Sequence, residues 1–364
     1  MPPFQAPFSG FRGTEISRRP FPWHGKGVLT LFLSLVLILS LALVLPLVTS
    51  CVSPVPVPPS ATGPKVPGLA DAQSWIPQGL WRLPDDRFVV GAYQHTAQKT
   101  EAGEHIGPVR LSLLAENQPP HHIEIRKKDA PLLSHAGGIA IHEGHLYIAN
   151  ALDGRVFRGP WNPDATTIDV ELFLTHPTSA DNLGICPEGL LWVGQFYREA
   201  TLYTRSLGTW HDANGNAKRA LIVAYDPADR QPRKALAVRR RLQGFAITPE
   251  WVILSCSFGQ NRPSDLAFYP SPLQEAPHED LTLPDGTRIP LYHLNVRTEN
   301  RELPPMSEEI YVDGDHVWVV FESGARSRFP RARTRIHHIL AYPMPHEDAD
   351  MTADPPEPLR TAYP

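Results

Sequence analysis

Three acidic residues near the C-terminal end of the chain are spaced so that they could do chemistry together. Glu308 and Glu309 stand directly before the apolar residues 310–312, and Glu322 follows the apolar run 316–321. Grouped carboxyl groups can bind a polar ligand, hold a divalent cation or exchange protons, provided that a scaffold brings them to one place. The strands that would position these acids therefore have to be identified.

The composition excludes one class of partner and favours one class of fold. The 364 residues include 34 Lys and Arg against 38 Asp and Glu, which gives a formal net charge of -4. This balance produces no field suited to nucleic acid. The chain also contains 40 Pro, which disfavour long helices and suit loops and strand ends. We expect an all-β chain that binds no nucleic acid.

The N-terminal region contains a segment that could cross a membrane. Residues 28–48 carry no charge, and at about 1.5 Å per residue a helix of this length spans the roughly 30 Å hydrocarbon layer. Arg and Lys residues precede this segment, and none follows it closely. The positive-inside rule therefore predicts a cytoplasmic segment 1–27, a transmembrane helix or signal sequence at 28–48, and a remainder outside the cytoplasm, in a bacterial cell envelope.

The end of the apolar segment leaves two kinds of membrane attachment open. Residues 47–51, "LVTSC", resemble the lipobox of bacterial lipoproteins, in which case cleavage would leave Cys51 lipidated. The 27 residues before the apolar run are long for a cleaved signal, which favours an uncleaved anchor. The Pro-rich residues 49–68 are then expected to be a semi-extended linker.

The exported part of the chain, 69–344, contains a repeat. A polar or glycine pair followed by small and apolar residues occurs at 77–83, 136–141, 180–185, 242–247 and 307–312, and each copy precedes a β-branched and aromatic run. We expect third strands near residues 109, 154, 220, 264 and 336, and fourth strands near 121, 168, 234 and 291.

Four antiparallel strands that recur every 45 to 65 residues or so are typical of a β-propeller. We predict five blades, with six as the alternative. The C-terminal segment 345–364 would contribute the closing strand of the last blade, at "EPLRTAY" from residue 357.

Strand order predicts where the polar residues meet. In an up-and-down blade, the start of the first strand and the end of the second lie on the same face of the disc. The residues that this places on the ligand-binding face are Gln78, Asp181, Asn182, Gln243, Glu308, Glu309, Glu322, Arg198, Arg262 and Arg326. His135 and His95 lie at the same positions and are candidates for a general base. The alternative is that these polar residues only cap backbone groups in solvated loops.

Two resemblances add expectations. Over residues 75–344, motifs such as "IPQGL", "HAGGIAI" and "PPMSEEIYV" resemble a family of uncharacterised bacterial secreted or membrane-anchored β-propeller proteins, which implies a fold and a compartment but no activity. More loosely, "ADNLGICPEGLLWVG" at 180–194 is similar to the gluconolactonase and strictosidine-synthase-like propellers, a superfamily that includes calcium-dependent lactonases and arylesterases. Those enzymes are six-bladed.

The second resemblance implies a metal at the propeller axis, held by a Glu and by Asn or Asp residues from first-strand starts. Asp181 and Asn182 match one such pair, and Glu308 could complete a Ca²⁺ site. Gln78 stands where a Glu would open the first blade, and the sequence "AGG" at 136–138 stands where an Asn would be expected.

The sequence thus leaves two functions open. The first is a membrane-anchored propeller that binds a small polar ligand, a saccharide or an envelope protein without catalysis. The second is a calcium-dependent hydrolase of lactones or esters. No Gly-x-Ser-x-Gly motif is present, so nothing supports a covalent mechanism.

Overall fold

The computed structural model describes residues 55–345, apart from 102, 104, 152, 200–205, 213–214 and 296. The segment 1–27, the apolar segment 28–48, Cys51 and residues 346–364 lie outside the described part. No helix within the described residues is long and apolar enough to cross a membrane. The membrane helix and the lipidation of Cys51 therefore stay predictions.

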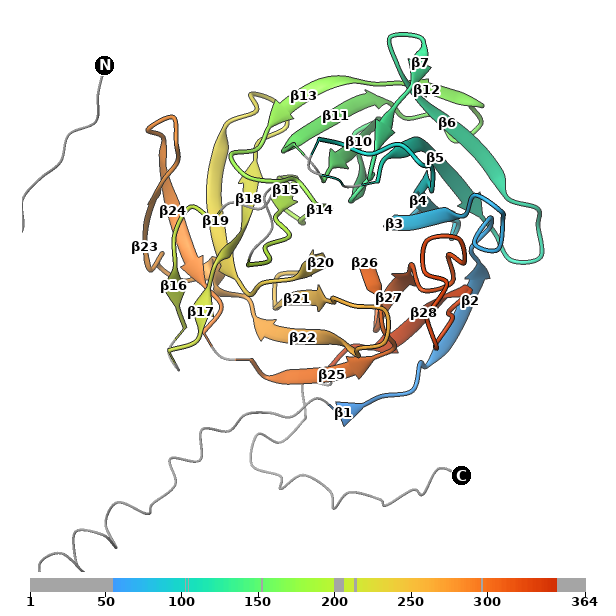
Figure 1. Ribbon diagram of the computed structural model, residues 1–364. Coiled ribbons are helices and arrows are strands. Elements are labelled where there is room, and N and C mark those ends of the chain that lie inside the picture. The colour runs from blue at the N-terminus through green and yellow to red at the C-terminus, as the bar shows by residue number, and fades with distance from the viewer. Residues whose placement is uncertain are drawn as a thin grey trace, which may run out of the picture. The chain divides into compact units, whose positions relative to one another are not determined.

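The described strands form five sheets of four or more strands, which surround a common centre (Figure 1). Sheet 1 contains β3 (Trp75–Arg82), β4 (Phe88–Gln94), β5 (Gly107–Leu114) and β6 (His121–Lys127), with the short strands β7 (Ala130–Pro131), β8 (Leu133–Ser134) and β12 (Thr167–Asp169) at its margin. Sheet 2 contains β9 (Ile139–His142), β10 (His145–Asn150), β11 (Arg155–Pro160) and β13 (Glu171–Thr175). Sheet 3 contains β14 (Asn182–Ile185), β15 (Leu191–Gly194), β18 (Ala220–Tyr225), β19 (Pro232–Val238), β24 (Arg288–His293) and β23 (Glu279–Thr282).

Sheet 4 contains β20 (Leu242–Ile247), β21 (Trp251–Cys256), β22 (Ser264–Pro270), β25 (Glu299–Leu303) and β1 (Val55–Pro56). Sheet 5 contains β26 (Ser307–Asp313), β27 (His316–Phe321), β28 (His338–Pro343) and β2 (Ala61–Lys65). A small hairpin of β16 (Trp210–His211) and β17 (Ala217–Lys218) lies in the loop between β15 and β18, and one 3-10 turn, η1, spans Pro272–Gln274.

The innermost strands of the five sheets form a ring. β3 contacts β9, β9 contacts β14, β14 contacts β20, β20 contacts β26, and β26 contacts β3. These strands coincide with the five copies of the sequence repeat, and the second strand of each sheet coincides with the β-branched run that follows each copy. The prediction of an all-β, propeller-like fold is therefore confirmed.

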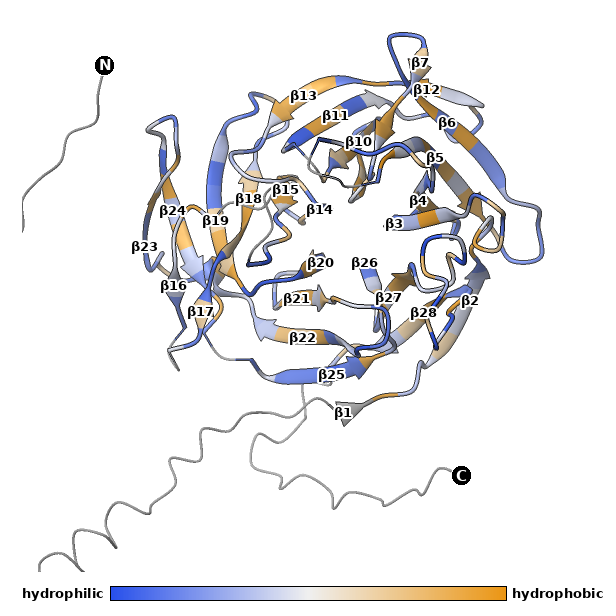
Figure 2. Cartoon of the chain, viewed as in Figure 1, coloured by the Kyte–Doolittle hydropathy of each residue, from blue (hydrophilic) through white to orange (hydrophobic). Residues whose placement is uncertain are grey.

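The predicted fourth strand of the fourth repeat is wrong. Residues near 291 form β24, which pairs in parallel with β19 of sheet 3. The outer strand of sheet 4 is instead β25, which pairs with β22. Its sequence, "ENREL", has no apolar run, and the strand is hydrophilic in Figure 2. Three of its five residues, Asn300, Arg301 and Leu303, are buried, but two of them are polar, so hydrophobic patterning could not reveal the strand.

The first and last parts of the described chain meet in sheet 5 by a route that the sequence did not reveal. β2, within the segment predicted as a linker, pairs antiparallel with β28 and forms the outer strand of the sheet. The pairing register shifts between Thr62 and Lys65, and Pro64 lies within this shift. Proline is tolerated there because an outer strand leaves one row of its N–H groups unpaired. The closing strand predicted from residue 357 lies outside the described residues.

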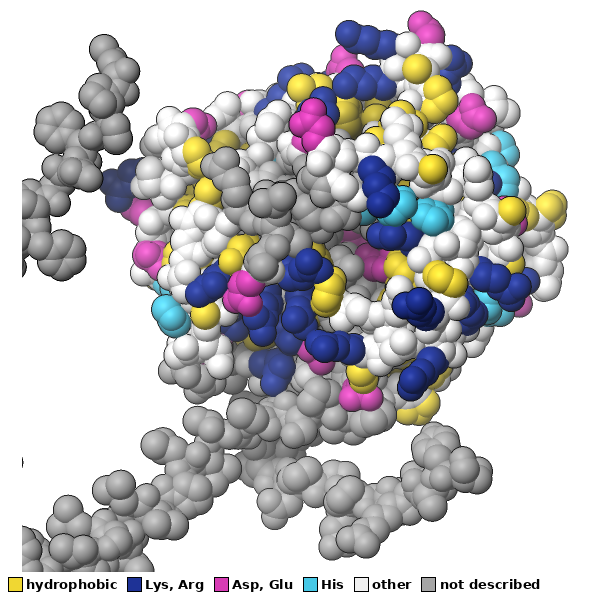
Figure 3. Space-filling model, in the orientation of Figure 1, with side chains coloured by type: hydrophobic (Ala, Val, Ile, Leu, Met, Phe, Trp, Pro, Cys, Tyr) yellow, Lys and Arg dark blue, Asp and Glu magenta, His cyan; other side chains and the backbone are white. Residues whose placement is uncertain are grey.

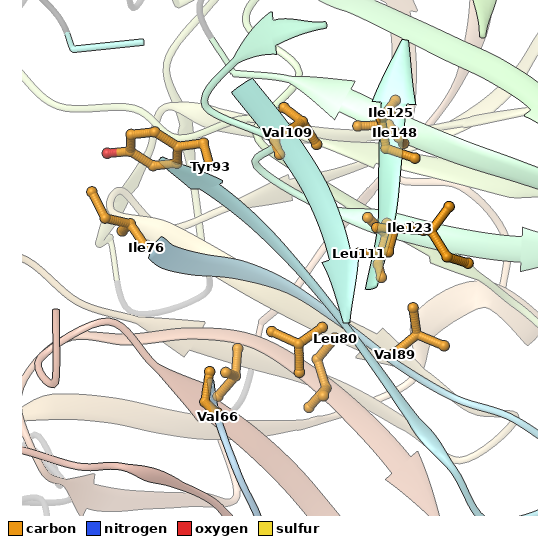
Figure 4. Packing of buried hydrophobic residues seen from close by; sticks show 14 of the residues in the cluster. Val66, Ile76, Leu80, Val89, Tyr93, Val109, Leu111, Ile123, Ile125 and Ile148 are labelled. Atoms are coloured by element: carbon orange, nitrogen blue, oxygen red, sulfur yellow. The ribbon is translucent and has the colours of Figure 1, made fainter. Parts of the chain in front are cut away.

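Apolar side chains fill the spaces between neighbouring sheets. Figure 4 shows such a cluster, in which Leu80 and Leu111 of sheet 1 lie near Ile148 of sheet 2 and Val66, just after β2. Because each sheet is covered on both faces, its second strand is almost continuously buried, as in β4 and β10. This packing leaves the ends of the inner strands as the place where polar side chains can gather.

Candidate functional site

Irregularities at the start of three inner strands position the candidate residues. The pairing register shifts between Pro77 and Gly79 in β3, between Leu242 and Gly244 in β20, and between Ser307 and Ile310 in β26. The residues inside these shifts are Gln78, Gln243, Glu308 and Glu309. A bulge re-aims the side chain of its extra residue. The sequence repeat therefore encodes polar groups at one end of the ring of inner strands.

A cavity of about 420 Å³ opens at this end of the ring. Its lining includes six of the predicted residues, namely Gln78, His135, Asp181, Arg198, Gln243 and Glu322. Figure 3 shows acidic side chains in a hollow near the centre of this face, with basic and histidine side chains around it. These six residues thus lie together around one concave part of the surface.

Two amides and two acids at this end of the ring form a connected chain of hydrogen bonds, and all of them except Glu308 line the cavity. The amide nitrogen of Gln78 donates to Glu322 over 3.1 Å, and that of Gln243 donates to Glu308 over 3.0 Å. Glu308 and Glu322 are themselves hydrogen-bonded to each other. Sheets 1, 4 and 5 therefore meet through four side chains.

The two linked acids hold protons more tightly than ordinary carboxyl groups. Burial raises the pKa of Glu322 to about 7, although the nearby Arg328 and the hydrogen bonds with Glu308 and Gln78 act to lower it. Burial and then repulsion from Glu322 raise the pKa of Glu308 well above its usual range. At neutral pH this pair can therefore both donate and accept hydrogen bonds.

Asp181 is a third acid with a raised pKa. Its Oδ2 accepts a hydrogen bond from the hydroxyl of Ser179 and another, over 2.6 Å, from the backbone N–H of Phe196. Burial outweighs these hydrogen bonds and raises the pKa of Asp181 to about 8. Because Asp181 also lines the cavity, it can present a neutral carboxyl group to a ligand at neutral pH.

Glu309 has a structural role at the axis. Its carboxyl group accepts hydrogen bonds from the backbone N–H groups of Leu183 in β14 over 3.3 Å, of Phe245 in β20 over 3.2 Å and of Ile310 over 3.4 Å. Burial raises its pKa well above the usual range, although these hydrogen bonds act to lower it. It is fully buried and does not line the cavity. A Cβ on Gly138 would lie 2.7 Å from its Oε2. The "AGG" sequence thus makes room for Glu309, which joins three inner strands.

The two histidine candidates differ in their surroundings. His135 lines the cavity, its ring centroid is 4.5 Å from that of Tyr93, and burial lowers its pKa to about 3. A group with so low a pKa is a weak base. His95 hydrogen-bonds to Ser327 over 3.0 Å and does not line the cavity, and burial lowers its pKa as well. Neither histidine has the properties of an efficient general base.

Two predicted arginines lie outside the cavity lining, and several lining residues were not predicted. Arg262 and Arg326 are exposed and do not line the cavity. The unpredicted lining residues include Tyr93, Phe196, Phe258, Met306 and Arg328. Arg328 follows Arg326 in the Arg-rich loop after β27, so the loop was identified correctly but not the residue that reaches inward. Side chains alternate between two faces along a strand but not in a loop, so the sequence could not show which arginine of this loop points toward the axis.

The donors do not fit the predicted calcium site. The described residues contain no group of three or more His, Cys, Asp or Glu side chains placed to hold a metal ion. Asn182 is fully buried, and its amide nitrogen donates to the carbonyl of Leu242. Its Oδ1 has no hydrogen-bond partner among the described residues, but it lies against the backbone of Gly194, only 2.1 Å from where a Cβ would be. Asn182 is thus held against backbone, and we derive no chemical step through a metal.

Comparisons with known proteins give only distant structural similarities. A scan against protein-family models and a search of the curated proteins found no match. A GH43 β-xylosidase/α-arabinofuranosidase from a compost microbial metagenome is 11% identical, with a TM-score of 0.44, over 80% of this chain and 96% of that chain. The PQQ-bound aldose sugar dehydrogenase of Streptomyces coelicolor is 13% identical, with a TM-score of 0.41, over 78% and 96%. A luciferin-regenerating enzyme is 9% identical, with a TM-score of 0.39, over 76% and 93%. We draw no conclusion about activity from these values.

Proposed function

We propose that this protein is a five-bladed propeller, anchored to a membrane through residues 28–48, which binds a small polar ligand in the cavity at the mouth of its ring of inner strands. The ligand is a small molecule such as a saccharide, or a polar group displayed by a protein of the cell envelope. The propeller acts outside the cytoplasm and carries out no chemical step.

One observation carries this proposal, namely the mixture of groups around the 420 Å³ cavity. Cavities of roughly 300 to 1,000 Å³ are typical of small-molecule sites. Glu322 and Asp181 have pKa values raised to about 7 and about 8, so at neutral pH they offer both hydroxyl donors and carbonyl acceptors. Gln78 and Gln243 add amide groups. Such a lining suits a ligand with several hydroxyl groups better than it suits an apolar one.

Binding should depend on the acids in the cavity. With the full chain in detergent micelles and a panel of monosaccharides as probes, we expect Glu322→Gln to weaken binding about tenfold in isothermal titration calorimetry. The amide cannot ionise, and a carboxylate accepts stronger hydrogen bonds from ligand hydroxyl groups than an amide oxygen does. The matched control is Glu171→Gln, an exposed acid on β13. The proposal fails if no member of the panel binds, or if Glu322→Gln binds as tightly as the control.

The alternative function, a calcium-dependent hydrolase of lactones or esters, rests on the same acids. Burial and then repulsion from Glu322 raise the pKa of Glu308, and a divalent cation would relieve the repulsion. If the alternative holds, millimolar CaCl₂ should raise the melting temperature of the wild type by several degrees but not that of Asp181→Asn, and the wild type should hydrolyse an aryl ester. The binding proposal expects no such shift and no hydrolysis.

A further inference from the structure

An exposed aromatic ring at the edge of the cavity is surrounded by arginines. Phe258, in the loop after β21, lines the cavity and remains 37% exposed. The guanidinium carbon of Arg198 lies 4.4 Å from the centroid of its ring, and that of Arg241 lies 5.3 Å away. Arg262 follows in the same loop, where its N–H donates to the carbonyl of Gly259. We call Arg198, Arg241, Arg262 and Phe258 the arginine rim.

The backbone around Arg241 is fixed, although its conformation is unfavourable. Arg241 has a φ of 66°, in the left-handed region that non-glycine residues rarely adopt. Its N–H donates to the carbonyl of Tyr197, and its carbonyl accepts the N–H of Ser257. The loops after β15 and β21 therefore both hold this residue beside Phe258. Strain of this kind is often found at binding sites.

Nearby acids do not neutralise Arg241 or Arg262. Glu199 pairs with Arg240 over 2.6 Å, and Asp265 pairs with Arg239 over 2.6 Å. Within the described residues neither Arg241 nor Arg262 forms an ion pair with a carboxylate. Burial, together with repulsion from neighbouring arginines that include Arg262 and Arg198, lowers the pKa of Arg241. An anion placed here would relieve this repulsion.

The chemistry of the arginine rim differs from that of the cavity interior. Guanidinium groups bind carboxylate and phosphate through paired, charge-assisted hydrogen bonds. The interior presents carboxyl groups that carry protons at neutral pH and amides, which suit hydroxyl groups. The exposed part of Phe258, which lines the cavity beside Arg198, can pack against the C–H face of a ring. A ligand that uses all three features carries hydroxyl groups at one end and an anionic group at the other.

We propose that the arginine rim is an anion-recognition subsite of the cavity, so that the ligand is a polyhydroxylated molecule bearing a carboxylate or phosphate group. This inference rests on the proposed function of the cavity and specifies the class of its ligand. It does not distinguish a uronic acid from a sugar phosphate, and the experiment below does.

The test compares three probes with the full chain in detergent micelles, namely glucose, glucuronate and glucose 6-phosphate. We expect one or both anionic probes to bind at least tenfold more tightly than glucose in isothermal titration calorimetry at low ionic strength, with this preference reduced by added NaCl. Whether glucuronate or glucose 6-phosphate is preferred identifies the anionic group.

Variants separate the arginine rim from the interior of the cavity. The double variant Arg241→Gln with Arg262→Gln should lose the preference for the anionic probes and keep its affinity for glucose, whereas Glu322→Gln should weaken all three probes. Arg288→Gln, an exposed arginine paired with Asp280 on the β23–β24 hairpin, is the control. If the double variant does not fold, the single variant Arg262→Gln is compared with the wild type in its place.

Three results would overturn the inference. If glucose binds as tightly as both anionic probes, or if the double variant keeps the preference, the rim does not recognise anions although the cavity remains a polar site. If none of the three probes binds to the wild type, the inference fails together with the proposed function.

Discussion

Replacing Glu309 by alanine is expected to lower the stability of the protein more than any other single change at the candidate site. The substitution leaves the backbone N–H groups of Leu183, Phe245 and Ile310 without the acceptor they share. A buried donor without a partner costs about 1 to 3 kcal/mol, so a loss of several kcal/mol is expected. Urea unfolding at pH 7, followed by tryptophan fluorescence, measures it.

Two further variants test whether the loss of these backbone hydrogen bonds causes the lower stability. Glu309→Gln keeps one oxygen acceptor but places an amide N–H₂ group against a backbone donor, so its loss should be intermediate. Glu308→Gln should cost less than either, because Glu308 is hydrogen-bonded to the side chains of Gln243 and Glu322, which can adjust. If Glu309→Ala is no less stable than Glu308→Gln, Glu309 does not hold the inner strands together.

Stability should fall as the pH rises from 6.5 to 8. In the folded protein the pKa of Asp181 is raised to about 8 and that of Glu322 to about 7. The folded state therefore keeps protons that the unfolded state has already released above about pH 4, and this stabilisation is lost as pH approaches the folded-state values. One pKa unit corresponds to about 1.4 kcal/mol. Melting temperatures measured across this range test the expectation.

The pH range is chosen because two buried histidines change the stability with pH in the direction opposite to that of the acids. Burial lowers the pKa of His135 and of His176 to about 3, so these residues contribute stability above about pH 6.5 that is lost as the pH falls. Above pH 6.5 their contribution is constant, and the change with pH comes from the acids.

Asp181→Asn isolates the contribution of one acid. The amide keeps an oxygen that can accept from Ser179 and Phe196, and it cannot ionise. We therefore expect a melting temperature at pH 8 several degrees above that of the wild type, with a difference that shrinks toward pH 4. Glu171→Gln should follow the wild type. A difference between Asp181→Asn and the wild type that is the same at pH 5 and pH 8 would show that Asp181 titrates normally.

Most strands of the repeat could be predicted from the sequence. The inner strands and the apolar second strands were predicted because their burial on both faces leaves a local signal of small, β-branched and aromatic residues. The same repeat placed Gln78, Asp181, Gln243 and Glu322 on one face, and the structure brings these four to one cavity. These strands and the polar residues at their ends are each encoded by residues close together in the chain, so the pattern of residue types along the sequence can reveal them.

The pairing of segments that are far apart in the sequence became visible in the tertiary structure alone. β2 closes sheet 5 by pairing with β28, almost the whole domain away in sequence, through backbone groups that carry no sequence signal. Glu308 and Glu309 are neighbours of the same type, yet one joins the hydrogen bonds at the cavity and the other binds the backbone of two other sheets. The bulge at the start of β26 sets the directions of these two side chains, and the strands packed against β26 determine its conformation.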